Sequence, residues 1–201
     1  NADLSANDKF YFDNLNESVK YFNEAIKINP FKNYDSEILN ISKILTRTGQ
    51  KKVKEEDYQA ALNLFNKAIE YSPKYLGVYF YKGNLYLAIQ DYELALESFK
   101  AGLGKNIKEG NYKILYMAGK ALEMLGDFDK ALEFYKFSLN NKPSYIKAHF
   151  AVANILYEQQ NFNAAKSTLI DIINKDSSYI KAYESLVNIF LDLYVKVKSE
   201  Q

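Results

Sequence analysis

The sequence predicts an all-α solenoid in which pairs of helices stack one after another along the chain. Two observations carry this prediction. A nine-residue phrase recurs at steps of 34, 36 and 34 residues, and a second helical pattern fills the space between its copies. A fixed period of this size is typical of repeat proteins, whose units bury their apolar faces only against their neighbours. The phrase begins at Asp57, Asp91, Asp127 and Asn161.

Each copy of the phrase predicts the start of a helix, because a leading Asp or Asn can cap the free amide groups there. Pro73 and Pro143 follow two of these helices, where proline stops continuation. A small residue four positions into the phrase lets two helices approach closely: Ala61, Ala95, Ala131 and Ala165. A large residue follows one turn later on the same face: Phe65, Phe99, Tyr135 and Leu169.

Between the phrases, apolar residues three and four positions apart predict another helix in each repeat. Two of these helices contain an isolated glycine, Gly83 and Gly119, which costs each about 1 kcal/mol relative to alanine. We expect close packing against the small residue of the partner helix to compensate. The copies are Tyr79-Lys82-Gly83-Tyr86, Leu115-Ala118-Gly119-Leu122, His149-Val152-Ala153-Leu156 and Tyr183-Leu186-Val187-Phe190.

This combination resembles the tetratricopeptide repeat (TPR), a helix-turn-helix unit of 34 residues, over about residues 42 to 198. The resemblance implies an α-α superhelix of tandem TPR repeats. The usual tryptophan is absent, and Ile107 and Ser177 stand where proline is usual. The best matching sets are Tyr79-Gly83-Tyr86-Ala95-Phe99 and Leu115-Gly119-Leu122-Ala131-Tyr135-Pro143.

We expect one solenoid domain over residues 1–201. Its parts are an irregular N-terminal repeat at 1–41, repeats at 42–75, 76–111, 112–145 and 146–179, and a capping or truncated-repeat helix at 180–198. Residues 14–30 predict one second helix, whose poorly formed partner would lie in 2–13. The segment 31–56 holds an elongated first helix, a longer loop, or both. Glycines at 102, 104 and 110 predict a looser joint, and the apolar last helix suggests that it docks elsewhere.

Composition excludes several functional classes. The net charge of +1 gives no global case for nucleic acid or an anionic membrane. No apolar run reaches the ~18 residues of a membrane span. With no cysteine and one histidine, zinc sites and nucleophilic dyads lack their usual members. His149 is interpreted as a packed interface residue. We therefore expect no enzyme activity, no cofactor and no metal. The compartment stays open, because the absence of cysteine fits either side of a membrane and the start at Asn1 without a methionine leaves open that an upstream signal or anchor was cut away.

Periodic rows on one face of the first helices predict a peptide-binding concave surface. Asparagine matches the donor and acceptor of a peptide unit, aromatic rings offer rigid apolar area, and lysines would face carboxylates. An alternative is that the aromatics are partly buried packing and the lysines only solvate the face. The predicted residues are Phe80, Tyr81, Asn84, Lys113, Tyr116, Met117, Lys120, Lys147, Phe150, Asn154, Tyr157, Lys181 and Asn188.

The resemblance also implies a test of one known binding mode. Chaperone-binding members hold a terminal carboxylate with lysine, asparagine and arginine side chains over three repeats. Only two of the five corresponding positions match here, so we predict that the chain does not bind such acidic C-termini. These positions are Phe80, Asn84, Met117, Lys147 and Ala151.

Taken together, the residues favour a non-catalytic adaptor that binds an extended segment of a partner protein and assists complex assembly or localisation. Two alternatives stay open. The chain could be a structural protein that self-associates through its terminal helices, or a scaffold fragment of a longer protein. Nucleic-acid binding would require a strongly basic inner surface, which the net charge of +1 opposes.

Overall fold

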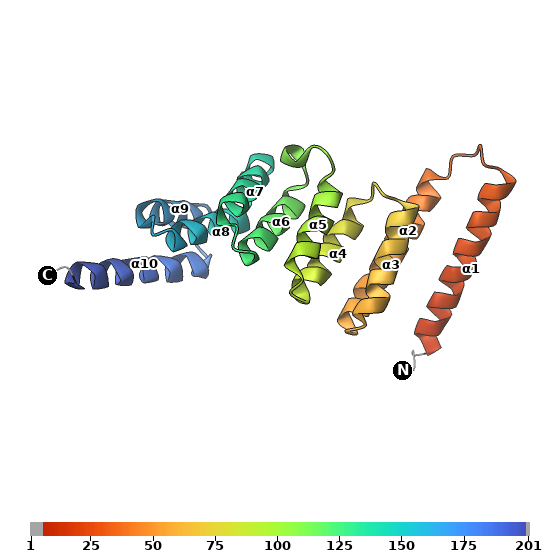
Figure 1. Ribbon diagram of the computed structural model, residues 1–201, viewed down its shortest axis with the longest axis horizontal. Coiled ribbons are helices and arrows are strands. Elements are labelled where there is room, and N and C mark those ends of the chain that lie inside the picture. The colour runs from red at the N-terminus through yellow and green to blue at the C-terminus, as the bar shows by residue number, and fades with distance from the viewer. Residues whose placement is uncertain (1–5, 200–201) are drawn as a thin grey trace. The chain divides into compact units, whose positions relative to one another are not determined.

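Every regular element of residues 6–199, the part that the computed structural model describes, is helical (Figure 1), which confirms the all-α prediction. The chain forms two compact units, residues 1–78 and residues 79–201. The single-domain arrangement and the repeat boundaries stay predictions. The helices are α1 (Ala6–Ile28), α2 (Asp35–Lys54), α3 (Tyr58–Tyr71), α4 (Leu76–Ala88), α5 (Tyr92–Leu103), the short 3-10 helix η1 (Ile107–Glu109), α6 (Tyr112–Met124), α7 (Phe128–Asn141), α8 (Ile146–Glu158), α9 (Phe162–Lys175) and α10 (Ile180–Ser199).

The first unit contains α1, α2 and α3. α2 is an elongated first helix of 20 residues, which decides between the alternatives for the segment 31–56. Residues 6–28 form one continuous helix, so the expected separate partner in 2–13 is wrong for residues 6–13, and residues 1–5 lie outside the described part. Leu45 of α2 and Phe65 of α3 are buried in the core between these two helices.

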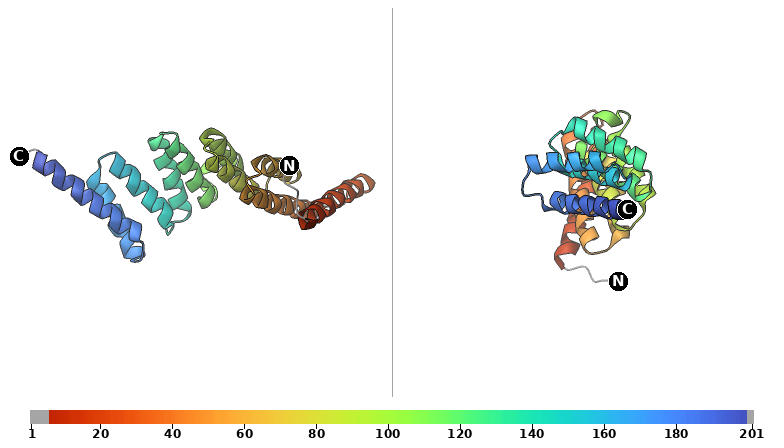
Figure 2. Two further views of the ribbon diagram at one scale, coloured as in Figure 1. Left: turned by 90° about the horizontal axis from the view of Figure 1, so that it is seen from below. Right: turned by 90° about the vertical axis from the view of Figure 1, so that its left-hand side faces the viewer.

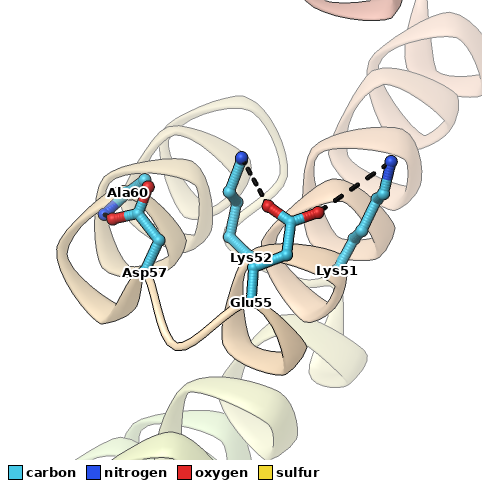
Figure 3. Close-up of polar contacts among 5 residues, drawn as sticks. All are labelled: Lys51, Lys52, Glu55, Asp57 and Ala60. Carbon is cyan, nitrogen blue, oxygen red and sulfur yellow. Dashed lines mark hydrogen bonds and ion pairs between the residues drawn. The ribbon is translucent and has the colours of Figure 1, made fainter. Parts of the chain in front are cut away.

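The turn between α2 and α3 shows how the sequence ends one helix and starts the next (Figure 3). Glu56 takes a left-handed φ of 60°, which reverses the chain. The amide group of Asp57 donates back to the carbonyl of Lys52 at 3.0 Å, and the Asp57 side chain accepts from the amide of Ala60 at 3.2 Å. Asp57 therefore completes the end of α2 and caps the start of α3. Beside it, Lys52 Nζ lies 2.6 Å from the Glu55 carboxylate.

The same turn recurs in every following repeat, which confirms the predicted capping role of the leading Asp or Asn. The cap side chains of Asp91, Asp127 and Asn161 each accept from the amide group three residues later. The residue before each cap has a left-handed φ, and glycine occupies only one of these positions. These residues are Gln90, Gly126 and Gln160.

The glycines inside the first helices correct one prediction. A Cβ atom on Gly83 would lie 2.4 Å from Cε1 of Phe99, and one on Gly119 would lie 2.6 Å from Cε1 of Tyr135. Gly49 faces Phe65 in the same way in the first unit. The glycines therefore make room for the aromatic ring of the second helix, and not for its small residue as expected.

In the second unit, which begins at Tyr79 within α4, the helices follow one another in hairpins up to α10 (Figures 1 and 2). The predicted small residues Ala95, Ala131 and Ala165 are fully buried in the core, which agrees with close helix approach. The joint after α5, where the sequence predicts a looser connection, contains η1. Ile107 of η1 packs on the core, and Gly110 lies directly against the side chain of Leu103.

Candidate functional site

Two adjoining cavities of about 330 and 280 Å³ lie on the second unit and share Glu123 and Asn154. The volume of the larger one is at the lower end of the range of ligand clefts. We call the pair the groove. The larger cavity is lined by Tyr116, Lys120, Glu123, Tyr135, Lys147, Phe150, Ala151, Asn154, Tyr179 and Lys181. The smaller is lined by Glu123, Ala153, Asn154, Tyr157, Glu158, Leu169, Ser185, Asn188 and Ile189.

The groove brings together eight of the thirteen residues predicted to bind peptide. They come from α6, α8 and α10, the first helices of successive repeats, because residues 34 apart occupy equivalent positions. The eight are Tyr116, Lys120, Lys147, Phe150, Asn154, Tyr157, Lys181 and Asn188. The remaining five do not line it: Phe80, Tyr81 and Asn84 lie on α4, and Lys113 and Met117 on α6.

Tyr135 is buried, and the other aromatic side chains that line the groove are half-buried and also pack against neighbouring rings. The ring centroid of Tyr116 lies 5.4 Å from that of Tyr145 and 5.5 Å from that of Tyr135. Phe150 meets Tyr179 edge to face at 5.4 Å. One face of each groove ring is thus held by a neighbouring ring, which fixes its position at little further cost in side-chain entropy when a ligand binds.

Sequence reasoning missed the tyrosines that hold these rings. Tyr145 and Tyr179 stand immediately before α8 and α10 and are 34 residues apart. Each packs on the aromatic residue of the preceding first helix, Tyr116 or Phe150. Their shared period was a signal that could have found them. Glu123 and Ser185 have no equivalent in the other repeats and gave no such signal.

The larger cavity of the groove is lined by three lysines and one carboxylate, so its charge is predominantly positive. Lys120, Lys147 and Lys181 are exposed at its edge, and within residues 6–199 none of their ammonium groups forms an ion pair. Glu123 is engaged within the protein, since Oε2 accepts a 2.5 Å hydrogen bond from the Tyr135 hydroxyl. The arrangement therefore offers unpaired cations beside an apolar wall.

Burial controls the protonation of the groove phenols. Desolvation, with smaller contributions from nearby Tyr145 and Glu123, raises the pKa of Tyr116 to about 12. Desolvation and the hydrogen bond to Glu123 raise the pKa of Tyr135 well above its usual range. Both hydroxyl groups therefore stay neutral throughout the physiological pH range.

The smaller cavity has a polar rim. The Tyr157 hydroxyl donates a short hydrogen bond to the Asp192 carboxylate, joining α8 to α10, and this bond raises the pKa of Tyr157. Asn154 and Asn188 present amide groups along the same wall. An amide side chain carries both a donor and an acceptor, as a peptide unit does.

His149 lies outside the groove. It is half-buried on α8, and its Nε2 atom lies 2.7 Å from the carbonyl oxygen of Pro143. Among the residues that the structure describes, His, Cys, Asp and Glu side chains do not gather in a group of three that could hold a metal. In the same part of the chain, no helix combines the length and apolarity needed to cross a bilayer.

Comparison with known proteins gives matches to tetratricopeptide-repeat sequence patterns at residues 52–116 and 112–145. A TPR repeat-containing protein of Methanocaldococcus jannaschii is 26% identical over 159 residues, which is 74% of this chain and 27% of that protein. The BBSome complex member BBS4 of Bos taurus is 35% identical over 80 residues, 40% of this chain and 15% of that protein. The chain thus spans less than a third of these curated relatives.

Two solved structures share the fold. YrrB, described as a TPR protein with an unusual peptide-binding site, superposes with a TM-score of 0.61 at 19% identity and covers 86% of this chain and 84% of its own. The MamA protein superposes with a TM-score of 0.66 at 18% identity and covers 78% of this chain and 85% of its own. At these identities the likeness concerns the helical repeat architecture.

Proposed function

The chain is a tetratricopeptide-repeat protein, and on that premise we propose that it holds an extended segment of a partner protein in the groove of its second unit. In this role it is a non-catalytic scaffold that helps to assemble or localise a complex. Repeats of this family are typically interaction modules. A fold alone does not define a ligand, so the proposal depends on the side chains of the groove.

The observation that carries the proposal is the pairing of held aromatic rings with unpaired lysines. Phe150 and Tyr116 supply apolar area whose geometry is already fixed by Tyr179 and Tyr145. Lys147 projects from the same helix as Phe150 and forms no ion pair within residues 6–199. A segment with an aromatic or aliphatic side chain next to a carboxylate would satisfy both features.

The descriptions of two similar proteins support the proposal that the chain binds another protein. YrrB is described as having a peptide-binding site, and BBS4 is a member of a complex. Both descriptions concern those proteins. They agree with the proposal that this chain also acts by holding another protein.

A random peptide library tests the proposal while the partner is still unidentified. The 201-residue chain would be used to select from random dodecapeptides displayed on phage, and the enriched peptides would be measured by fluorescence polarisation. We expect sequences that combine an acidic residue with a large apolar one. Phe150→Ala with Lys147→Glu should abolish their binding.

Lys136→Glu is the matched control, because Lys136 is an exposed lysine on the second helix α7 and does not line the groove. It should bind the selected peptides as the unchanged chain does. Circular dichroism would confirm that all variants are folded. Peptides that bind the groove variant and the unchanged chain equally well would move the site elsewhere and refute the proposal.

A further inference from the structure

The last helix, α10, presents a continuous apolar stripe to solvent. Six large apolar residues follow one another at spacings of three and four, and their exposed fractions lie between 44% and 69%. This is the spacing of a coiled-coil seam. The stripe consists of Ile180, Tyr183, Val187, Phe190, Tyr194 and Val197.

The stripe is separate from the face that holds α10 in the fold. Ala182 and Ile189 are fully buried against α9, and Leu186 and Leu193 pack on the same cluster. The carboxyl-terminal part of α10 extends past α8 and α9, as both views show (Figures 1 and 2). The helix is therefore fixed by one face and offers a second one along its whole length.

The preceding repeats show what kind of element covers this second face. Val187 and Phe190 correspond to Gly119 and Leu122 of α6, which are buried under the second helix of their repeat, α7. Within residues 6–199 no second helix follows α10. The apolar residues of the stripe have the spacing that packs against the apolar face of an amphipathic helix.

We propose that the occupant is α10 of a second copy of this chain, packed antiparallel across a two-fold axis. Charge complementarity selects the copy and the direction. Glu184 and Lys198 flank the stripe on one side, with Leu191 midway, one heptad from each. In an antiparallel pair, each Glu184 lies opposite Lys198 of the other copy. In a parallel pair, each Glu184 would lie beside the other Glu184, and each Lys198 beside the other Lys198.

The same arrangement has two further physical advantages. The dipoles of antiparallel helices attract where those of parallel helices repel. A two-fold contact uses the same surface on both partners, so it closes at the dimer and leaves no apolar stripe exposed. Leu191, which is 57% exposed, would lie beside the axis and face its own counterpart.

The dimer extends the proposed function. Two grooves carried by one particle would bind a partner with two target segments more tightly than a single groove does, through effective concentration. The dimer contact does not require a peptide bound in the groove. Its test is therefore independent of the peptide experiment.

The primary test is the mass of the 201-residue chain by sedimentation equilibrium over a range of concentrations. We expect a dimer that Val187→Glu and Phe190→Glu convert to monomer. Ile170→Glu is the matched control, because Ile170 is 44% exposed on α9 and lies outside the stripe. All of these residues are exposed, so the variants should fold, as circular dichroism would verify.

The direction of pairing has its own readout. The chain has no cysteine, so Leu191→Cys introduces a single thiol that should form a disulfide-linked dimer in the antiparallel arrangement. Glu184→Lys and Lys198→Glu should each raise the dissociation constant about tenfold, and the double variant should restore it.

Three outcomes would overturn the proposal. A chain that is monomeric at every concentration would show that the stripe does not pair with a second copy. A dimer that survives both stripe variants would place the contact elsewhere. A stripe-dependent dimer that fails to cross-link through Leu191→Cys and ignores the charge exchange would refute the antiparallel arrangement.

Discussion

The Tyr135 hydroxyl group and the Glu123 carboxylate form a 2.5 Å hydrogen bond that ties α7 to α6 beneath the groove. Phe65 and Phe99 occupy the position of Tyr135 in other repeats, and Leu87 occupies that of Glu123. The third repeat therefore replaces an apolar pair with a polar one. Tyr135 is 1% exposed, so its hydroxyl depends on this acceptor.

We predict that Glu123→Leu destabilises the chain by about 2 kcal/mol, because it leaves a buried hydroxyl without a partner. Tyr135→Phe should cost about 1 kcal/mol, since the partly exposed Glu123 can then hydrate. The double variant restores the Leu87 and Phe99 pattern and should be close to the unchanged chain. Urea unfolding of the four proteins measures this. Additive costs in the double variant would contradict the pairing.

Alkaline pH should weaken the second unit through Tyr116. Its folded-state pKa of about 12 lies above the unfolded value of 10, so between these values the unfolded state loses the proton first. The contribution of Tyr116 to the free energy of unfolding is therefore complete below pH 10 and falls as the pH rises toward 12. At pH 11.5 the loss amounts to about 2 kcal/mol.

Tyr116→Phe removes this titration and keeps the ring. At pH 8 the free energy of unfolding of this variant should match that of the unchanged chain. At pH 11.5 the variant should be more stable than the unchanged chain by about 2 kcal/mol. Tyr21→Phe, at a phenol on α1 that is 65% exposed and lies outside the stripe, serves as the exposed control. Urea titrations at the two pH values provide the measurement. Equal gains in both variants would mean that burial of Tyr116 is not responsible.

Much of the fold was predictable from the sequence, since period and residue class determine it. The caps at Asp91 and Asn161 follow from the local chemistry of helix starts, which needs no tertiary information. The set of residues that line the groove was partly predictable, because residues 34 positions apart lie on equivalent faces of successive first helices. Tyr135 was placed on the same helix face as Ala131, but its hydrogen bond to Glu123 was not predicted, since that bond depends on how two helices meet in one repeat.

The continuous helix α1 and the glycine contacts were harder to predict. Periodicity resolves a helix only where it repeats, and residues 2–13 have no counterpart further along the chain. Gly83 was correctly placed inside a helix. However, sequence spacing could not tell whether Ala95 or Phe99 lies against it, because both occupy the same face of α5.

Size complementarity between Gly83 and Phe99 gives a prediction of its own. Gly83→Ala gains about 1 kcal/mol in helix propensity, but its Cβ would lie 2.4 Å from the ring, and overpacking costs about 1 to 3 kcal/mol. We expect a net loss of stability of up to about 2 kcal/mol. The fourth repeat carries alanine and leucine at these positions, Ala153 and Leu169.

In a Phe99→Leu background, the same Gly83→Ala change should therefore be neutral or stabilising. The free energies of unfolding of the two single variants and the double variant form a cycle that isolates this coupling. An equal cost of Gly83→Ala in both backgrounds would show that the ring does not determine the residue at this position.

The left-handed turn residues allow a final prediction about the backbone. Gly126 has a φ of 80°, and no atom lies within 4 Å of a Cβ placed on it. Any cost of Gly126→Ala therefore arises from the backbone conformation and not from a clash, and should be about 1 kcal/mol. Gly126→Asn should cost less, because asparagine tolerates this conformation.

Gln160 provides the reciprocal test, since it holds a φ of 57° without being glycine. Gln160→Gly should relieve the strain and leave the chain as stable as before or slightly more so, because part of the gain is offset by the greater entropy of glycine in the unfolded chain. Thermal unfolding of the three variants measures the order of stability. A stable Gly126→Ala protein together with a destabilised Gln160→Gly protein would show that the turn conformation does not limit stability.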